Sequence, residues 1–559
     1  MRISRANLRG AGGLIFAILA LGVAPGGARA ATFSTSSAAV IAMSGGRAVV
    51  AWTDGGFVRT ADQLASGDWT RGTPLGRAMD GVSPRLEASP VGDVMVVWQS
   101  GRALRSAFRK AGSRSWTRET IVGAGQAGEA SIGLVLDQTG RATVTDLDFT
   151  AGTGFGSLGV MSRVPGHTWG APTFIAGGVG TSAIALDASG NMALAFTTAD
   201  YVSRTIIVWA TTLPLGAARW AKPMAIAGSE SIDHRVVRIA GGSEGKFLVT
   251  WASAVSTGSD ANTPIVAHAA RSDVLGHWES LPNLLAPAGV GVASPSYPDI
   301  AVDRSGNAVA AWPFPTANHD QALAAARLPA AGNDWTSSTV LDAPSSRDES
   351  DSPPAVAFDD DGSADIAFVK RSTSGFFLRF ATAQGPLGVW QGQGASIAKV
   401  SDCALSCAAE TDLPPAIALG EKHGIAIATR TKAGLVVIAR DGPDQPWAGP
   451  TALQAVGTTA AYLRSARVRR GFVAPVASCA LAPCVAVAVL RTRGDKPQIL
   501  GRLRLAIPTL ARVSGRMSLS QWARARLTHG ARLHTELSVG LQNSDGTTER
   551  LRLNVLVHS

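Results

Sequence analysis

The stretch PDIAVDRSGNAVAAW, residues 298–312, consists of two short apolar runs on either side of a polar turn. Asp303 closes the first run three residues before Gly306, and Trp312 stands six residues after that glycine. An aspartate side chain caps such a turn, and glycine accepts the left-handed backbone that a short hairpin loop requires. The stretch therefore predicts a β-hairpin whose second strand carries a tryptophan.

The spacing between a turn glycine and a second-strand residue recurs along the chain. The second-strand residues of successive copies are 46, 48, 50, 55, 61, 56 and 62 residues apart. The eight copies are Gly46 to Trp52, Gly92 to Trp98, Gly140 to Asp146, Gly190 to Phe196, Gly245 to Trp251, Gly306 to Trp312, Gly362 to Phe368 and Gly424 to Arg430. Cys484 to Leu490 is a ninth, partial copy. A period of about 50 residues is typical of repeat proteins.

A third apolar run and a second tryptophan follow in each copy, and helical periodicity is almost absent. The second tryptophans are Trp69, Trp116, Trp169, Trp220, Trp278, Trp335, Trp390 and Trp447. Four short strands per repeat predict an all-β protein, a β-propeller of about eight four-stranded blades, within a range of seven to nine. A residue required once per blade favours packing between blades over a set of sugar-stacking faces.

Two copies carry a charged residue where the others carry an aromatic one. These residues are Asp146 and Arg430. A charge at this position either lies at a solvated blade edge, which is the interpretation we favour, or points into a functional pocket. Asp146 and Arg430 are therefore the residues that the sequence indicates as candidates for binding.

Over residues 35–505 the repeat resembles exported β-propellers of the sialidase-like, Asp-box type. An Asp-box reads S-x-D-x-G-x-x-W, whereas VDRSGNAVAAW has its aspartate three residues before the glycine and its tryptophan six after it. The resemblance implies a propeller and, in such enzymes, glycoside hydrolysis by an arginine triad, a tyrosine paired with glutamate, and an acid/base carboxylate. None of Tyr201, Tyr297 and Tyr462 stands in a context that matches the nucleophile. Only the fold is therefore carried over.

The first thirty residues have the pattern of an export signal. Arginines precede the apolar run GLIFAILALGVA (13–24), and small residues at Ala28 and Ala30 suit cleavage after Ala30. That run is too short to span a bilayer, and no later segment has about 18 uninterrupted apolar residues. We therefore expect a secreted or cell-wall-associated protein, with an uncleaved N-terminal anchor as the alternative.

The four cysteines stand in two close pairs in the last third of the chain. Export permits disulfides. Two local bridges, Cys403 to Cys407 and Cys479 to Cys484, are the simplest pairing, although four cysteines allow three connectivities. A metal site is the alternative, but these spacings lack a nearby pair of histidines, so no metal is expected.

The net charge of +10 is concentrated near the C-terminus. Residues 463–533 hold 14 basic residues against Asp495 alone, whereas residues 31–462 have a net charge of −6. Arginines alternate there with apolar residues, as in strands with one wet face. Such a face attracts anionic cell-wall polymers or lipid headgroups. The alternative is that arginine merely fills exposed strand positions. Export and the scarcity of aromatic residues disfavour nucleic-acid binding.

The chain has no G-x-S-x-G elbow, no H-E-x-x-H and no Gly-rich phosphate loop, and no cofactor is expected. The predicted domains are a signal peptide (1–30), a β-propeller (31–505) and a basic β-rich C-terminal region (506–559). The predicted function is binding of glycans or proteins through a propeller face, and the alternative is a sialidase-like glycoside hydrolase acting at the axis. Three arginines and two carboxylates that converge at the axis would favour the hydrolase. An axis lined by alanine and valine would favour the binding protein.

Overall fold

The structure is a computed structural model of the 559-residue chain. It describes residues 39–557 except 45, 55, 71, 80–81, 102, 122–131, 150–155, 201–204, 232–236, 255–264, 285–297, 317–320, 344–348, 359–361, 386–387, 402–413, 421–423, 432–433, 443–444, 454–465, 470–471, 479–483, 494–496, 508–511, 515, 530–531 and 544–547. The expected signal peptide (1–30) thus lies outside the described residues. No helix in the described part has the length and apolar character needed to cross a membrane.

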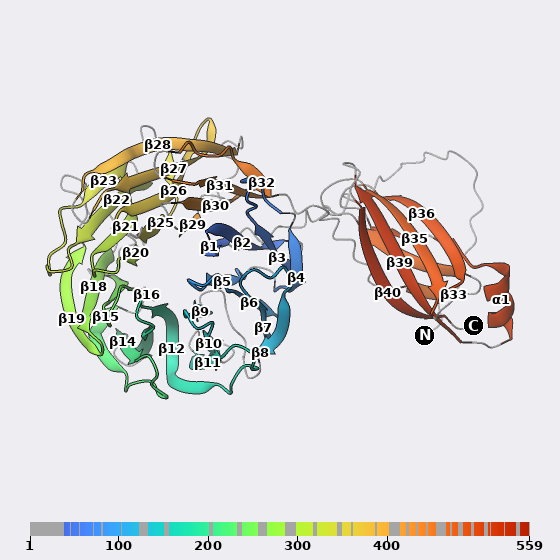
Figure 1. Ribbon diagram of the computed structural model, residues 1–559, viewed down its shortest axis with the longest axis horizontal. Helices are drawn as coiled ribbons and strands as arrows, with labels where there is room; N and C mark the ends of the chain where they lie inside the picture. Colours follow the sequence, from blue (N-terminus) through green and yellow to red (C-terminus); the bar gives the residue numbers. More distant parts are fainter. Residues whose placement is uncertain are drawn as a thin grey trace, which may run out of the picture. The chain divides into compact units, whose positions relative to one another are not determined.

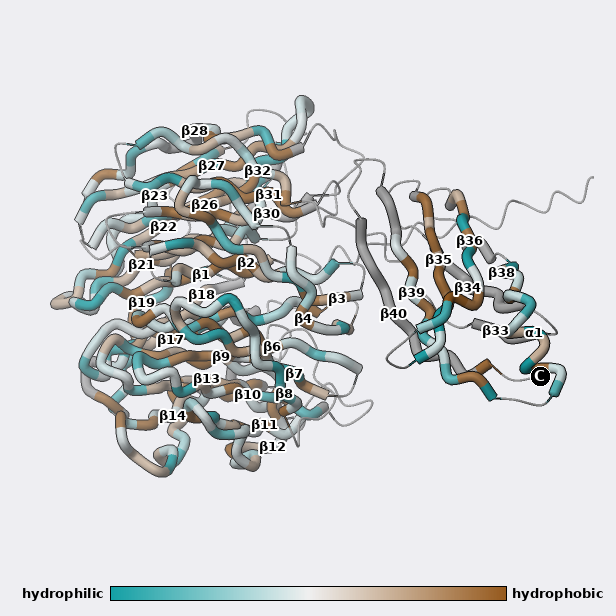
Figure 2. The backbone as a smooth tube through the Cα atoms, turned by 45° about the vertical axis from the view of Figure 1, so that its right-hand side comes forward, coloured by the Kyte–Doolittle hydropathy of each residue, from teal (hydrophilic) through white to brown (hydrophobic). Residues whose placement is uncertain are grey.

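One compact unit, Ser34–Thr458, is built from antiparallel sheets in which each strand pairs with its neighbours in sequence (Figure 1). Apolar residues are concentrated along these strands (Figure 2). The first two sheets consist of β1 (Val40–Ser44), β2 (Arg47–Asp54), β3 (Phe57–Asp62) and β4 (Thr73–Arg77), and of β5 (Arg85–Ala88), β6 (Val94–Ser100), β7 (Ala103–Arg109) and β8 (Thr117–Ile121).

The third and fourth sheets share one long strand, β12 (Thr173–Leu186). Its first half, up to Val179, pairs with β11, and its second half, from Val179 on, pairs with β13. The two sheets therefore form one seven-stranded sheet with the order β15-β14-β13-β12-β11-β10-β9. The other strands are β9 (Gly133–Leu136), β10 (Ala142–Phe149), β11 (Gly156–Arg163), β13 (Met192–Asp200), β14 (Thr205–Leu213) and β15 (Met224–Ser231).

The later sheets of this unit repeat the same pattern. One has a fifth strand, because both β24 and β25 pair with β26. The strands are β16 (Val237–Gly241), β17 (Phe247–Ala254), β18 (Ile265–Val274), β19 (His277–Leu284), β20 (Asp299–Val302), β21 (Ala308–Pro315), β22 (Gln321–Leu328), β23 (Thr339–Asp342), β24 (Ser350–Asp351), β25 (Ala355–Phe358), β26 (Ala364–Ser372), β27 (Gly375–Ala383), β28 (Trp390–Ser401), β29 (Ala416–Leu419), β30 (Ile425–Thr431), β31 (Gly434–Arg440) and β32 (Thr451–Leu453).

The innermost strands lie around a common axis (Figure 1). Contacts link β1, β5, β9, β12, β16, β20, β25 and β29 in that order, and β29 contacts β1 in turn. Successive sheets thus pack against one another around this axis, which is the arrangement of a β-propeller. The expected all-β class and propeller type are confirmed.

The turns between first and second strands have the chemistry that the sequence predicts. Gly306 has a φ of 93°. The Asp303 carboxylate accepts hydrogen bonds from the backbone N–H (2.8 Å) and the side-chain amide (2.7 Å) of Asn307. Asp187 closes its own turn in the same way and also accepts from the backbone N–H of Gly245 in the next sheet, at 2.7 Å. One aspartate can therefore both close a hairpin and join two sheets.

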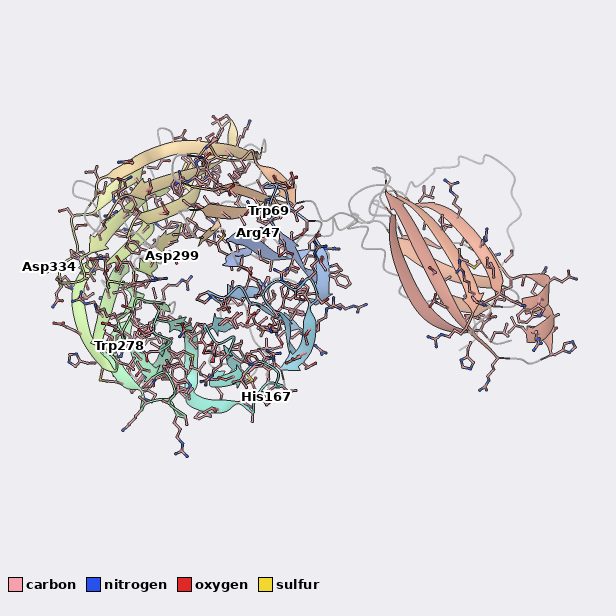
Figure 3. The ribbon with its side chains drawn as sticks, in the orientation of Figure 1. Arg47, Trp69, His167, Trp278, Asp299 and Asp334 are labelled. Atoms are coloured by element: carbon pink, nitrogen blue, oxygen red, sulfur yellow. The ribbon has the colours of Figure 1, made fainter. Side chains whose placement is uncertain are left out.

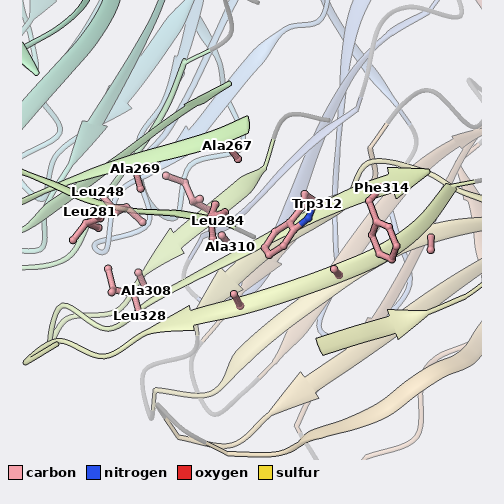
Figure 4. Close-up of a cluster of buried hydrophobic side chains, with 14 residues drawn as sticks. Leu248, Ala267, Ala269, Leu281, Leu284, Ala308, Ala310, Trp312, Phe314 and Leu328 are labelled. Atoms are coloured by element: carbon pink, nitrogen blue, oxygen red, sulfur yellow. The ribbon is translucent and has the colours of Figure 1, made fainter. Parts of the chain in front are cut away.

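The aromatic residues of the second strands fill the spaces between neighbouring sheets. Trp312 is completely buried in a cluster that includes Ala267 and Leu284 of the preceding sheet (Figure 4). A corresponding cluster around Trp52 includes residues of β1–β3 and of β29–β32. The other buried members of the set are Trp98, Phe196, Trp251 and Phe368. The second tryptophans, such as Trp169 and Trp390, also lie in clusters between neighbouring sheets, so the interpretation of the tryptophans as packing residues is confirmed.

Arginines near the ends of third strands link sheets in a second way. Arg327 of β22 donates to the carbonyl oxygens of Ala383 (3.1 Å) and Gly385 in the next sheet. Its guanidinium also lies over the ring of Trp390, 4.8 Å from the centroid. Hydrogen bonds and stacking of this kind suit the planar guanidinium better than an ammonium. Our sequence analysis assigned these arginines no role.

The second unit contains two sheets and one helix. The larger sheet has the order β36-β35-β39-β40, and the helix α1 (Gln521–Thr528) begins after Ser520, whose hydroxyl accepts from the N–H of Ala523. Ala523 and Leu527 of α1 pack into a core with Leu490 and Leu537 of the sheet. The strands are β33 (Ala466–Arg469), β34 (Phe472–Ser478), β35 (Cys484–Thr492), β36 (Ile499–Ile507), β37 (Arg512–Ser514), β38 (Met517–Ser518), β39 (Leu533–Asn543) and β40 (Thr548–Val557).

The boundary between the units differs from the sequence-based expectation. The first unit ends at Thr458 and not at residue 505. The expected ninth repeat, Cys484–Leu490, belongs to β35, which pairs with β36 and β39 of the second unit. Its local pattern predicts a strand correctly, but its partner strands come from later in the chain.

The variant Gly76→Ala should destabilise the first unit. A Cβ atom on Gly76 in β4 would lie 2.7 Å from Cζ2 of Trp98, in the ring that packs the first two sheets together. We expect a loss of about 1–3 kcal/mol, measured as a lower Tm, because such overpacking displaces a buried side chain. In Gly449→Ala the new Cβ meets no atom within 4 Å, so this control should keep the Tm. Equal Tm values for both variants would contradict the prediction.

Candidate functional site

Asp146, nominated from the sequence, lies in the middle of β10 opposite Gly159 of β11. Only 4% of it is exposed, and its neighbours Thr145 and Leu147 are fully buried. The solvated-edge interpretation is therefore wrong for Asp146, because the second strand of a sheet packed on both faces has no wet side. Its role in binding remains a prediction.

Arg430 and the cysteines can be placed only in part. Arg430 lies in β30 opposite Leu435, and its side chain is outside the described part of the structure. The same holds for the side chain of Cys484 in β35. Cys403, Cys407 and Cys479 lie in undescribed segments. The binding role of Arg430 and the two disulfides therefore stay predictions.

The inner strands around the axis are mainly apolar, with sequences such as AIAL in β29 and AVAF in β25. Within their described residues, four charged side chains interrupt this pattern. They are Arg85 and Glu87 in β5, Arg238 in β16 and Asp299 in β20. The described residues of the inner strands thus include neither the three arginines of the sialidase expectation nor an unbroken series of alanine and valine.

Asp299 and Arg238 lie at the beginnings of adjacent inner strands, and Figure 3 labels Asp299 at the inner side of its sheet. The Asp299 carboxylate accepts a hydrogen bond from the backbone N–H of Val356 in the next sheet, at 2.9 Å. Burial raises the pKa of Asp299, and the Arg238 guanidinium and the Val356 N–H oppose that rise. Arg238 itself is exposed. A hydrogen-bond acceptor and a donor cation are therefore available at one end of the axis.

Among these four residues, Glu87 has a pKa close to neutral pH. Burial raises its pKa to about 7, and the nearby Arg85 guanidinium opposes the rise. Arg85 donates to the carbonyl oxygen of Ile132 in the third sheet, at 2.8 Å. A carboxyl with a pKa near 7 can exchange a proton at neutral pH. In the order of contacts, three inner strands separate β5, which carries Glu87, from β20, which carries Asp299.

A buried group of five charged residues joins the sheet of β20–β23 to that of β24–β28. The Lys370 ammonium lies 3.0 Å from the Asp342 carboxylate and 3.2 Å from that of Glu349, and Arg379 lies 3.4 Å from Asp342. Asp351, opposite Lys370 in the β24–β26 pair, is buried with neither carboxylate oxygen hydrogen-bonded. Burial and then repulsion from Asp342 raise its pKa well above the ordinary value. With Asp351 protonated, the group is electrically neutral.

This neutral group is best explained as a link between two sheets. Protonation of the buried carboxyl removes the cost of an uncompensated charge. Among the described residues, no set of three or more His, Cys, Asp or Glu side chains is arranged to hold a metal ion.

Our sequence analysis did not single out Glu87, Arg238 or Asp299. The signal is present, because inner strands such as AIAL, AVAF and GLVL are apolar throughout, whereas RLEA, VRIAG and DIAV contain charged residues. A charge is unusual where a first strand packs between layers. Comparing the first strands of all repeats, instead of the second, would have found these residues.

No family model matches the chain, and no curated protein matches it. Among solved structures it is similar to polysaccharide lyase Uly1, with 10% identity, a TM-score of 0.37, and coverage of 74% of this chain and 88% of that one. It is also similar to the Aleuria aurantia lectin (16% identity, TM-score 0.32, 55% and 95% covered) and to a Hadza microbial sialidase (11%, 0.33, 56% and 71%). Similarities this low assign no activity to the chain.

Glu87 should make the stability of the first unit depend on pH. Its folded pKa of about 7 exceeds the ordinary 4.5, so its stabilising contribution is complete below pH 4.5 and is lost as the pH rises through 7. When the pH rises from 4.5 to 7, the free energy of unfolding of Glu87→Gln should therefore fall less than that of the wild type, by up to about 3 kcal/mol. Tm values at several pH values from 4.5 to 7.5 measure this difference. Asp334→Asn, at an exposed position, is the control and should follow the wild type.

Proposed function

We propose that the first unit is a closed, eight-bladed β-propeller that interacts with glycans outside the cytoplasm. The count follows when β12 is assigned to both the third and the fourth blade. Closure is supported by the cluster that packs Trp52 and other residues of β1–β3 against β29–β32. Export is supported by the arginines, the apolar run and the small residues within the first thirty positions.

Glycan binding is assigned to the end of the axis where Arg238 and Asp299 lie. The observation that carries the proposal is this pair of opposite charges on adjacent strands of an otherwise apolar inner ring. Sugar hydroxyls both donate and accept hydrogen bonds, so a carboxyl beside a guanidinium can bind vicinal hydroxyls. Arg238 is exposed, and Asp299 is already positioned by the Val356 N–H. Asp299 therefore requires little ordering before a ligand binds.

Glycan-array binding followed by calorimetry on the best glycan tests this assignment. Arg238→Ala and Asp299→Asn should each weaken binding at least about tenfold, the loss expected for one charge-assisted hydrogen bond. The asparagine keeps an acceptor for the Val356 N–H, so folding should be preserved. Arg114→Ala and Asp334→Asn are the matched controls at exposed positions. Unchanged affinity in the two axis variants would rule out this site.

Glycoside hydrolysis is the second candidate, and the pKa of Glu87 favours it. A carboxyl that is still protonated near pH 7 can serve as a general acid toward a glycosidic oxygen. Binding remains our first choice, because the described inner strands carry two arginines and not a triad.

Hydrolysis of a panel of aryl glycosides tests the enzyme hypothesis. Glu87→Gln should lower kcat at least about 100-fold, and wild-type activity should decline above pH 7 as the acid ionises. Asp334→Asn should keep full activity. Activity that survives in Glu87→Gln would exclude Glu87 as the acid, and a panel with no turnover would leave glycan binding as the function.

A further inference from the structure

The sheet β36-β35-β39-β40 of the second unit has one buried and one open face. In β35, Ala486, Ala488 and Leu490 are buried in the core of the unit, where α1 also packs. The alternate residues face the other way, and Val487 is 40% exposed. Successive side chains of a strand point to opposite faces, so the open face continues through the positions paired with Val487 and Val489.

The strand register places arginines on one edge of this open face. Arg504 and Arg502 of β36 pair with Val487 and Val489, and both arginines are exposed. On the other side of β35, the same valines pair with Gly540 and Ser538 of β39. We call these two arginines and the two valines the basic face.

The described charged side chains of this unit are almost all positive. The arginines with described side chains are all exposed, and the one acidic side chain described from β33 on is Glu536. These arginines are Arg491, Arg493, Arg502, Arg504, Arg516, Arg524, Arg526 and Arg532. The guanidinium fork matches carboxylate and phosphate oxygens in pairs, which a lysine ammonium does not. The basic face therefore suits repeated anionic groups.

We propose that the basic face binds a linear anionic glycan polymer, with carboxylate or phosphodiester groups along its length. The small residues beside the arginine edge leave room for a chain, and arginines two positions apart on β36 repeat at about 7 Å along the strand. A membrane surface is a poorer match, because the described part of the face offers valines and no aromatic or long apolar side chain for insertion. Single-stranded nucleic acid would need stacking aromatic residues, which the described positions of this face also lack.

This inference is independent of the glycan bound at the propeller axis. It concerns a different unit, an anionic ligand recognised by its charge, and different residues. Variants of the basic face should leave binding at Arg238 and Asp299 unchanged, so that failure of one proposal does not affect the other.

Binding of the full chain to immobilised polymers tests the proposal. The probes are polygalacturonate, poly(glycerol phosphate), neutral dextran and phosphatidylglycerol vesicles. The wild type should bind at least one anionic polymer, and not dextran. Arg502→Gln/Arg504→Gln should raise the Kd about tenfold and reduce the slope of log affinity against log salt by about 1.5, as expected for two lost ion contacts.

Arg524→Gln/Arg526→Gln is the matched control, because it removes the same charge from α1 on the opposite side of the sheet. It should change the Kd less than twofold. Equal losses in the two double variants would overturn the proposal in favour of unlocalised charge attraction. Binding to vesicles with no binding to either polymer would overturn it in favour of a membrane surface.

A second pair of variants guards against a folding artefact. Val487 is exposed in the middle of the face, so Val487→Glu should fold with a wild-type Tm and lose polymer affinity about tenfold by repulsion. Val487→Thr should retain affinity. Wild-type affinity in a folded Val487→Glu protein would show that the polymer does not lie on this face.

Discussion

The first unit depends on one constraint, which is that each sheet must bury both of its faces. A short strand such as AVAAW in β21 is apolar on either side, and a single sheet of such strands would expose both sides to water. Packing of successive sheets around a common axis covers these faces. Trp312 and the equivalent aromatic residues fill the wedge-shaped space that results, because only a large side chain reaches both sheets.

Burial of both faces also determines where chemistry can occur. Positions on the second strands are used for packing, so even a charged residue there, such as Asp146, is enclosed. Arginines such as Arg327 are similarly committed to carbonyl oxygens and aromatic rings of the next sheet. What remains for a ligand is the inner edge of the ring and the ends of its strands. Arg238 and Asp299 occupy that region.

The sequence was sufficient for the repeat, the turn and the packing role of the tryptophans, because each depends on local chemistry within one period. Asp303 and Gly306 form the predicted turn. Properties that depend on partners far along the chain could not be predicted. Cys484–Leu490 has the pattern of a propeller strand but pairs with β39, and the pKa of Glu87 depends on burial that its own strand does not encode.

The continuous strand β12 has a consequence for how the ring could have been assembled or could be re-engineered. Other blades are joined by connecting segments, where new termini or an inserted domain cost few hydrogen bonds. At β12 the outer strand of one blade runs into the inner strand of the next, with ladder pairs to β11 and β13 on either side of Val179. Circular permutation there would cut a hydrogen-bonded strand. The third and fourth blades should therefore be kept together as one unit when the chain is permuted or a domain is inserted.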